Sequence, residues 1–135
     1  GFDLVKMPKG RLQIQGLANF QRGVWENDDH LWWTHAKPGD KLELKLAVEA
    51  AGKHALSVAM TKAPDYGIVQ FYLDGEKIGE PIDLYATKVE PTGKVKLGDF
   101  DLSAGEHVLT VEIVGANEKA VQSYMFGLDR IFLEK

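Results

Sequence analysis

The residues of this sequence with chemical potential for ligand binding are aromatic side chains next to hydrogen-bonding groups. Asp65 and Tyr66 are neighbours, so a carboxylate able to accept two hydroxyl groups stands beside a ring on which an apolar surface can stack. The other candidate contact residues are Trp33, Tyr85, Asn117 and Tyr124. Together these side chains indicate reversible binding of a hydroxyl-rich molecule. The alternative is structural, because Asp65 can cap a turn and aromatic rings can pack in a core.

Signatures of catalysis are absent from the sequence. It contains no Gly-x-Ser-x-Gly elbow, no His-Glu-x-x-His pair, no phosphate-binding loop and no dinucleotide fingerprint. Its lack of cysteine excludes thiol catalysis and cysteine-ligated zinc. Glycoside hydrolysis needs two carboxylates fixed about 5 to 10 Å apart across a cleft, and no spacing in the sequence shows such a pair. We therefore predict a chain without enzyme activity of its own and without a cofactor.

Two histidines close to acidic residues raise the question of a metal. His30 directly follows Asp28 and Asp29, and His35 comes five residues later, a spacing that matches no established ligand motif. Calcium held by oxygen atoms is the alternative, although the sequence has no Asp-x-Asp-x-Asp loop. We predict no metal site and keep a structural calcium ion as the alternative.

The other two histidines occupy equivalent places in two similar hairpins. His54 follows Ala51-Gly52 and His107 follows Ala104-Gly105, each two residues before a leucine of the next strand. Equivalent placement predicts a structural role for both, with each ring hydrogen-bonded to the backbone of its turn.

Adjacent tryptophans point to opposite faces if they lie in a strand. Of Trp32 and Trp33, one is therefore expected to be exposed. Trp33 leads into the following loop, so we predict that Trp33 is the contact residue. Trp25 is expected in the core, because burying an indole contributes about 5 kcal/mol before other costs.

Alternation of apolar and polar residues shows which elements must position these side chains. Residues 42–48, 54–60, 69–73 and 109–113 carry apolar side chains at nearly every second position, the pattern of strands with one buried face. Asp74-Gly75 is a two-residue hairpin signal. About eight such strands predict an all-β fold, a two-sheet antiparallel β-sandwich of the jelly-roll kind.

Strand reversal sorts the connections between the two ends of this sandwich. Tight turns end one group of strands, at 40–49, 68–73 and 95–103. The longer connections are expected at the opposite end, at 34–40, 63–67, 86–94 and 115–125. These longer loops contain or border all the candidate contact residues. Because loops on a rigid scaffold commonly carry binding residues, we predict one binding rim there.

Composition limits the possible partners. A length of 135 residues predicts a single domain, 1–135, and the absence of an initiator methionine before Gly1 predicts a module excised from a larger protein. The net charge of −4 without a basic cluster argues against nucleic-acid binding. No uncharged run is long enough for a transmembrane helix, so membrane insertion is not expected.

Several short motifs resemble the galactose-binding-like jelly-roll modules attached to bacterial glycoside hydrolases. The matching residues are Lys37-Pro38-Gly39-Asp40, Ala51-Gly52, Tyr72-Leu73-Asp74-Gly75, Ala104-Gly105-Glu106-His107 and the closing Gly127-Leu128-Asp129-Arg130-Ile131. More narrowly, residues 61–70, 117–120 and 124–129 are similar to the C-terminal β-sandwich domain of fructofuranosidase-like hydrolases of the difructose-anhydride type. The similarity covers roughly residues 30 to 135.

The resemblance implies a secreted or periplasmic, non-catalytic module that binds carbohydrate. Relatives usually place an asparagine near the last strand, where this chain has Gly127, so Asn117 and Tyr124 are expected to supply the polar contact. The second hypothesis is a structural domain whose aromatic end docks on the catalytic domain or on another copy without touching sugar, since tyrosine and tryptophan also suit interfaces.

Overall fold

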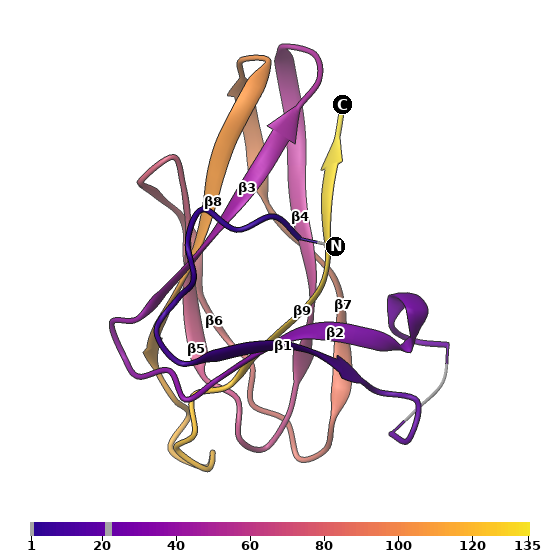
Figure 1. The fold of residues 1–135 in the computed structure, drawn as a ribbon, viewed down its shortest axis with the longest axis vertical. Coiled ribbons are helices and arrows are strands. Elements are labelled where there is room, and N and C mark those ends of the chain that lie inside the picture. Colours follow the sequence, from indigo (N-terminus) through magenta and orange to yellow (C-terminus); the bar gives the residue numbers. More distant parts are fainter. Residues whose placement is uncertain (1, 21–22) are drawn as a thin grey trace.

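Two antiparallel sheets face each other in the computed structural model, which describes residues 2–20 and 23–135 (Figure 1). The described residues form nine strands, β1 (Arg11–Gly16), β2 (Asp29–Thr34), β3 (Lys41–Val48), β4 (Gly52–Lys62), β5 (Ile68–Leu73), β6 (Glu76–Asp83), β7 (Glu90–Leu102), β8 (Gly105–Gly115) and β9 (Phe126–Glu134). One sheet has the order β1-β2-β9-β4-β7, and the other has the order β3-β8-β5-β6. The jelly-roll β-sandwich predicted from the sequence is therefore confirmed.

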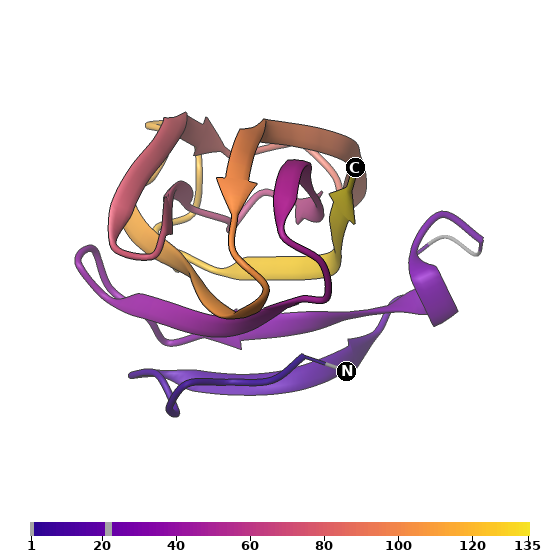
Figure 2. The ribbon, with the colours of Figure 1, turned by 90° about the horizontal axis from the view of Figure 1, so that it is seen from above.

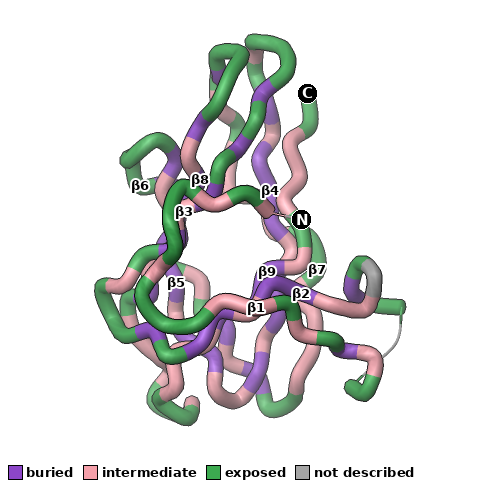
Figure 3. The backbone as a smooth tube through the Cα atoms, viewed as in Figure 1, coloured by how far each residue is buried: buried purple, intermediate pink, exposed green. Residues whose placement is uncertain are grey.

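The core lies between the two sheets and is built from the predicted alternating residues. Leu42, Leu44, Leu46 and Val48 of β3 are buried and face the other sheet, as are the alternate apolar residues of β4, β5 and β8. Phe71 of β5 and Phe126 of β9 meet edge to face across the core, with ring centroids 6.4 Å apart. Figure 3 shows the buried positions recurring along the strands and the exposed positions gathering in the turns. Apolar burial on these inner faces is the main contribution that holds the sheets together.

The N-terminal segment forms an extra edge beside β3. Leu4 pairs with Leu44 in an isolated bridge, and the N–H of Lys45 donates to the carbonyl of Asp3 at 2.8 Å. The chain then crosses to the other sheet, where β1 pairs with β2 in register from Arg11–Thr34 to Gly16–Asp29. Figure 2 shows this N-terminal layer along one side of the molecule. Residues 3–5 thus belong to the sandwich.

The tight turns meet at one end of the sandwich, at the top of Figure 1. His107 there links two turns, because its Nδ1–H donates to Asp74 Oδ2 at 2.5 Å and its Nε2–H donates to the Ser103 carbonyl at 2.8 Å. His54 Nδ1–H donates to the carbonyl of Gly52 at 2.8 Å. Both histidines are buried, and the predicted bonding of each ring to its own turn is confirmed.

The clamp between Asp74 and His107 shifts both of their pKa values. The hydrogen bonds to Asp74 and to the Ser103 carbonyl raise the pKa of His107 above its usual value. Burial alone would raise the pKa of Asp74, but the hydrogen bonds from His107 and Val108 outweigh it and hold that pKa below its usual value. Both acceptors around the ring favour its protonated form, in which each ring nitrogen can donate.

No helix long and apolar enough to cross a bilayer occurs in the part of the chain that the structure describes. The helical structure there is a short 3-10 turn, η1 (Glu26–Asp28), which precedes β2.

Candidate functional site

The longer loops come together at the end opposite the tight turns. Tyr66 forms a parallel bridge with Met125, and Ala63 forms one with Tyr85. The N–H of Gly67 donates to the Met125 carbonyl at 3.0 Å, and the N–H of Met125 donates to the Asp65 carbonyl at 3.2 Å. These backbone bonds join the loops after β4, β6 and β8 into one rim (lower part of Figure 1). The prediction that strand reversal places these loops together is confirmed.

A chain of buried hydrogen bonds supports the outer face of the five-stranded sheet beside this rim. Trp25 Nε1–H donates to Thr61 Oγ1 at 2.9 Å, and His30 Nδ1 lies 2.7 Å from the same hydroxyl. His30 Nε2 lies 2.6 Å from Gln15 Oε1. Each bond is satisfied if Thr61 donates its proton to Nδ1 and the Nε2–H donates to Gln15. Burial lowers the pKa of His30 to about 4, which agrees with this neutral ring.

Gly127 leaves the space that this arrangement needs. The rings of His30 and Tyr66 stack at a centroid distance of 6.4 Å and an angle of 24°. A Cβ atom on Gly127 would overlap the His30 ring and lie 3.0 Å from the Tyr66 hydroxyl oxygen. Burial, together with the nearby charge of Asp65, raises the pKa of the Tyr66 phenol, so the group stays protonated and able to donate a hydrogen bond.

The first hollow of the rim, here called the Trp32 hollow, has a volume of about 90 Å³. Its lining consists of Gln15, Phe20, Trp32, Ala63, Asp65, Tyr66, Val89 and Met125. Within residues 2–20 and 23–135, Trp32 Nε1 is the one buried side-chain polar atom without a protein partner. An unpaired buried N–H costs about 1–3 kcal/mol, and a polar atom that reached it would remove this cost. Asp65 lines the same hollow and adds a hydrogen-bond acceptor.

The second hollow, here called the Tyr124 hollow, shares Met125 with the first and measures about 450 Å³. It is lined by two segments, 34–37 and 122–125. His35 and Tyr124 contribute one residue from each wall, and both have left-handed backbones, with φ of 61° and 51°. Since Met125 lines both hollows, the two are neighbours along one rim.

The predicted exposure of Trp33 is wrong. Trp33 is fully buried, and its Nε1–H donates to the Lys9 carbonyl at 2.7 Å. The adjacent tryptophans do face opposite ways, but β2 pairs Leu31 with Leu128 and Trp33 with Phe126, which turns Trp33 into the core. Trp32 is consequently the partly exposed one. Tyr66 is also buried, so its ring forms part of the hollow's wall and offers no open stacking platform.

The remaining predicted residues divide between site and scaffold. Asp65 lines the Trp32 hollow and Tyr124 lines the other hollow. Asn117 lines neither, since its Nδ2 donates to Asp83 Oδ2 at 2.7 Å and its Oδ1 accepts the Lys119 N–H at 2.9 Å. Tyr85 likewise lines neither hollow and takes part in the bridge to Ala63. These two residues hold the loops in place.

Sequence reasoning missed Phe20 and Trp32. Phe20 is half exposed and belongs to the loop before β2, for which the sequence shows no periodic signal. Trp32 was indicated by its alternation with Trp33, but choosing between them requires the register of β2 on β9.

The histidines near Asp28 and Asp29 do not come together around a cation position. Both ring nitrogens of His30 are used in the buried network, whereas His35 is exposed in the turn after β2. Across the described ranges, no group of three histidine, aspartate or glutamate side chains is arranged to hold a metal ion.

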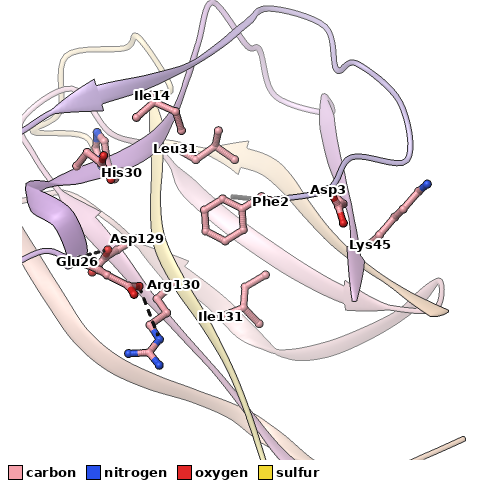
Figure 4. A pocket seen from close by; sticks show the side chains of 11 residues that line it. Phe2, Asp3, Ile14, Glu26, His30, Leu31, Lys45, Asp129, Arg130 and Ile131 are labelled. Atoms are coloured by element: carbon pink, nitrogen blue, oxygen red, sulfur yellow. Dashed lines mark hydrogen bonds and ion pairs between the residues drawn. The ribbon is translucent and has the colours of Figure 1, made fainter. Parts of the chain in front are cut away.

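A larger cleft of about 560 Å³ lies at the open side of the sandwich (Figure 4). Phe2 of the N-terminal segment projects into its middle, between Leu31 and Ile131. Burial, followed by the charges of Glu26 and Asp29, raises the pKa of Asp129 at one end of the cleft. We place the candidate site at the loop rim, because the predicted residues Asp65, Tyr66 and Tyr124 line the hollows there and none of them lines this cleft.

A shallow hollow on the outer face of the four-stranded sheet contains Tyr72. The Lys41 ammonium lies 5.2 Å from the centre of its ring, and its hydroxyl donates to Glu112 Oε1 at 2.6 Å. The Tyr72 ring and hydroxyl are therefore already engaged within the protein.

The fold defined by these sheets is that of carbohydrate-binding modules. A domain of a Paenibacillus xanthan lyase superposes with a TM-score of 0.82 at 18% identity, covering 100% of this chain and 13% of that one. A family 35 carbohydrate binding module from an environmental isolate gives 0.61 at 14% identity, covering 100% and 87%. The module CBM36, solved in complex with calcium and xylotriose, gives 0.56 at 12% identity, covering 99% and 98%.

The chain belongs to the family described as Domain of unknown function (DUF8441), whose model matches residues 9–135. Its sequence matches none of the curated proteins. Against the xanthan lyase it spans 13% of the length, so the likeness concerns one domain of that enzyme.

Proposed function

We propose that this chain is a non-catalytic, carbohydrate-binding accessory module of a secreted bacterial glycoside hydrolase. The observation that carries the proposal is the unpaired Trp32 Nε1–H in a hollow shared with Asp65. A sugar hydroxyl can accept the indole hydrogen bond and donate its own proton to the carboxylate. The likeness of the fold to carbohydrate-binding modules supports the same function.

The size of the Trp32 hollow sets how a sugar would sit. A volume of about 90 Å³ is that of about three water molecules, enough for a hydroxymethyl group or a pair of hydroxyls. The sugar ring then rests outside on Phe20, whose half-exposed side chain lies at the hollow. Few contacts on a shallow site give weak affinity, so tethering to an enzyme supplies the useful effective concentration.

Titration against a panel of neutral oligosaccharides tests the proposal. Phe20→Ala removes the stacking surface and Asp65→Asn removes the charged acceptor, and each is expected to weaken binding about tenfold, or about 1.4 kcal/mol. Ile14→Ala is the matched control, because Ile14 is 59% exposed against 50% for Phe20 and lines a different cleft. Binding that is equal in Phe20→Ala and wild type would reject this site.

A docking role is the second candidate, and the distribution of exposed apolar residues favours it. Of the seven large hydrophobic side chains exposed in the described chain, five lie between Val5 and Val24. Exposed apolar side chains on the N-terminal layer are available for contact with a partner surface. In the intact polypeptide, Val24→Asp should then lower thermal stability or oligomer size while glycan retention stays unchanged. The opposite pattern would favour carbohydrate binding.

A further inference from the structure

The Tyr124 hollow differs in charge from the rest of the molecule. The whole chain carries a net charge of −4, but the hollow is lined by Lys37 and His35 and by no carboxylate. Asp40 of the same turn accepts the backbone N–H of Lys37 through its Oδ2 at 2.9 Å and does not line the hollow. Lys37 is thus the formally charged residue of the lining, and a positive group in a concave surface attracts anionic ligands.

Neutral hydrogen-bonding groups complete the lining. Thr34, Gln122 and Ser123 contribute hydroxyl and amide groups, and Tyr124 contributes a half-buried ring. His35 Nδ1 lies 2.9 Å from Thr34 Oγ1 in a hydrogen bond, which orients the imidazole. A volume of about 450 Å³ is within the usual range of ligand pockets, so a whole sugar residue fits.

Backbone conformation adds a second argument from the same two walls. His35 and Tyr124 both have left-handed φ values, a region that disfavours residues with side chains. Glycine would adopt these angles without strain. The two positions with left-handed φ thus place a ring side chain on each of the two segments that line the hollow.

We propose that the Tyr124 hollow is a subsite for an anionic sugar residue, one that carries a carboxylate or a sulfate ester. The Lys37 ammonium supplies the charge-assisted hydrogen bond, and Ser123 and Gln122 offer further donors. Because Met125 lines both this hollow and the Trp32 hollow, the two are close enough for the anionic residue to belong to the same glycan as the sugar held beside Trp32. This subsite rests on the proposed carbohydrate-binding function.

The test uses uronate-containing oligosaccharides, each paired with its carboxyl-reduced neutral form and with the 6-O-sulfated derivative of that form. Wild type is expected to bind a uronate fragment about tenfold more tightly than the reduced one at low salt, since hydrogen bonds to charged groups are worth this much. The preference should shrink as salt rises. Tighter binding of the sulfated form would assign the anion to a sulfate ester and support the subsite equally.

Lys37→Gln should abolish the preference while leaving binding of the neutral fragment in place. Lys119→Gln is the charge-matched control, because Lys119 is exposed on the same loop as Tyr124 but lines neither hollow. Equal binding of charged and neutral fragments, or a preference that survives Lys37→Gln, would overturn the subsite. Neutral binding that still depends on Phe20 would leave the proposed function standing, whereas a lack of binding to every fragment would overturn both.

Discussion

Replacing Gly127 by alanine should destabilise the protein through a single added methyl group. That methyl overlaps the His30 ring, which cannot move away without losing its hydrogen bonds to Thr61 and Gln15. Two lost bonds cost about 2 kcal/mol and the overpacking another 1–3 kcal/mol. Alanine returns about 0.4–1 kcal/mol by restricting the unfolded chain. The net expected loss in the free energy of unfolding is about 3 kcal/mol.

Urea denaturation followed by tryptophan fluorescence measures this loss, and a thermal scan should show a drop of about 10 °C. Gly16→Ala is the control, because nothing lies within 4 Å of the position where its Cβ would stand. It should change the free energy of unfolding by less than about 1 kcal/mol. The double variant Gly127→Ala/His30→Ala should lose less free energy of unfolding than the sum of the losses in the two single variants. A Gly127→Ala protein as stable as Gly16→Ala would refute the proposed packing.

Four further outcomes follow from individual groups. The pKa of buried His30 is lowered from 6.5 to about 4, so the unfolded chain binds a proton at a higher pH than the native protein does. The free energy of unfolding should therefore fall by about 3 kcal/mol between pH 7 and pH 4. In His30→Gln, urea titrations at several pH values should show a smaller fall over the same range. The raised pKa of His107 gives stability that is present below pH 6.5 and is lost as pH rises through the native value, so Asp74→Asn should be most destabilising near pH 5 and approach wild type in alkali. Asp129→Asn should raise stability at pH 7, with a gain that vanishes toward pH 4, because burial disfavours the native carboxylate; a gain independent of pH would contradict this. Replacing Trp32 by benzothienylalanine, which lacks the N–H, should raise stability by about 1–3 kcal/mol and weaken glycan binding, and changes of the same sign would contradict the role given to the N–H.

The alternating segments could be predicted because their information is local. The alternate spacing of Leu42, Leu44 and Leu46 indicates which face of the strand is buried. The equivalent positions of His54 and His107 indicate that each ring bonds to the backbone of its own turn. The meeting of the long loops also needed only the direction of successive strands. These predictions required no knowledge of which strands pair.

Residues whose orientation depends on distant partners could not be placed in this way. Which of Trp32 and Trp33 faces the core is decided by pairing with β9, about a hundred residues further along the chain. Phe20 lies outside the strands, and Trp25 of the same connection is held by a bond to Thr61, 36 residues further along the sequence. The hydrogen bond from Asn117 could not be foreseen for the same reason, since its partner Asp83 ends β6, 34 residues earlier in the sequence. Long-range pairing of this kind leaves no periodic trace.

Met125 lines both hollows, and this has a consequence for how ligands bound in them affect each other. An unbranched thioether has three rotatable bonds and weak polarity, so Met125 can change rotamer at little cost. Occupation of one compartment can thereby reshape the other through a single side chain. Oxidation of this sulfur to the sulfoxide would replace an apolar side chain by a polar one and so alter the lining of both hollows together.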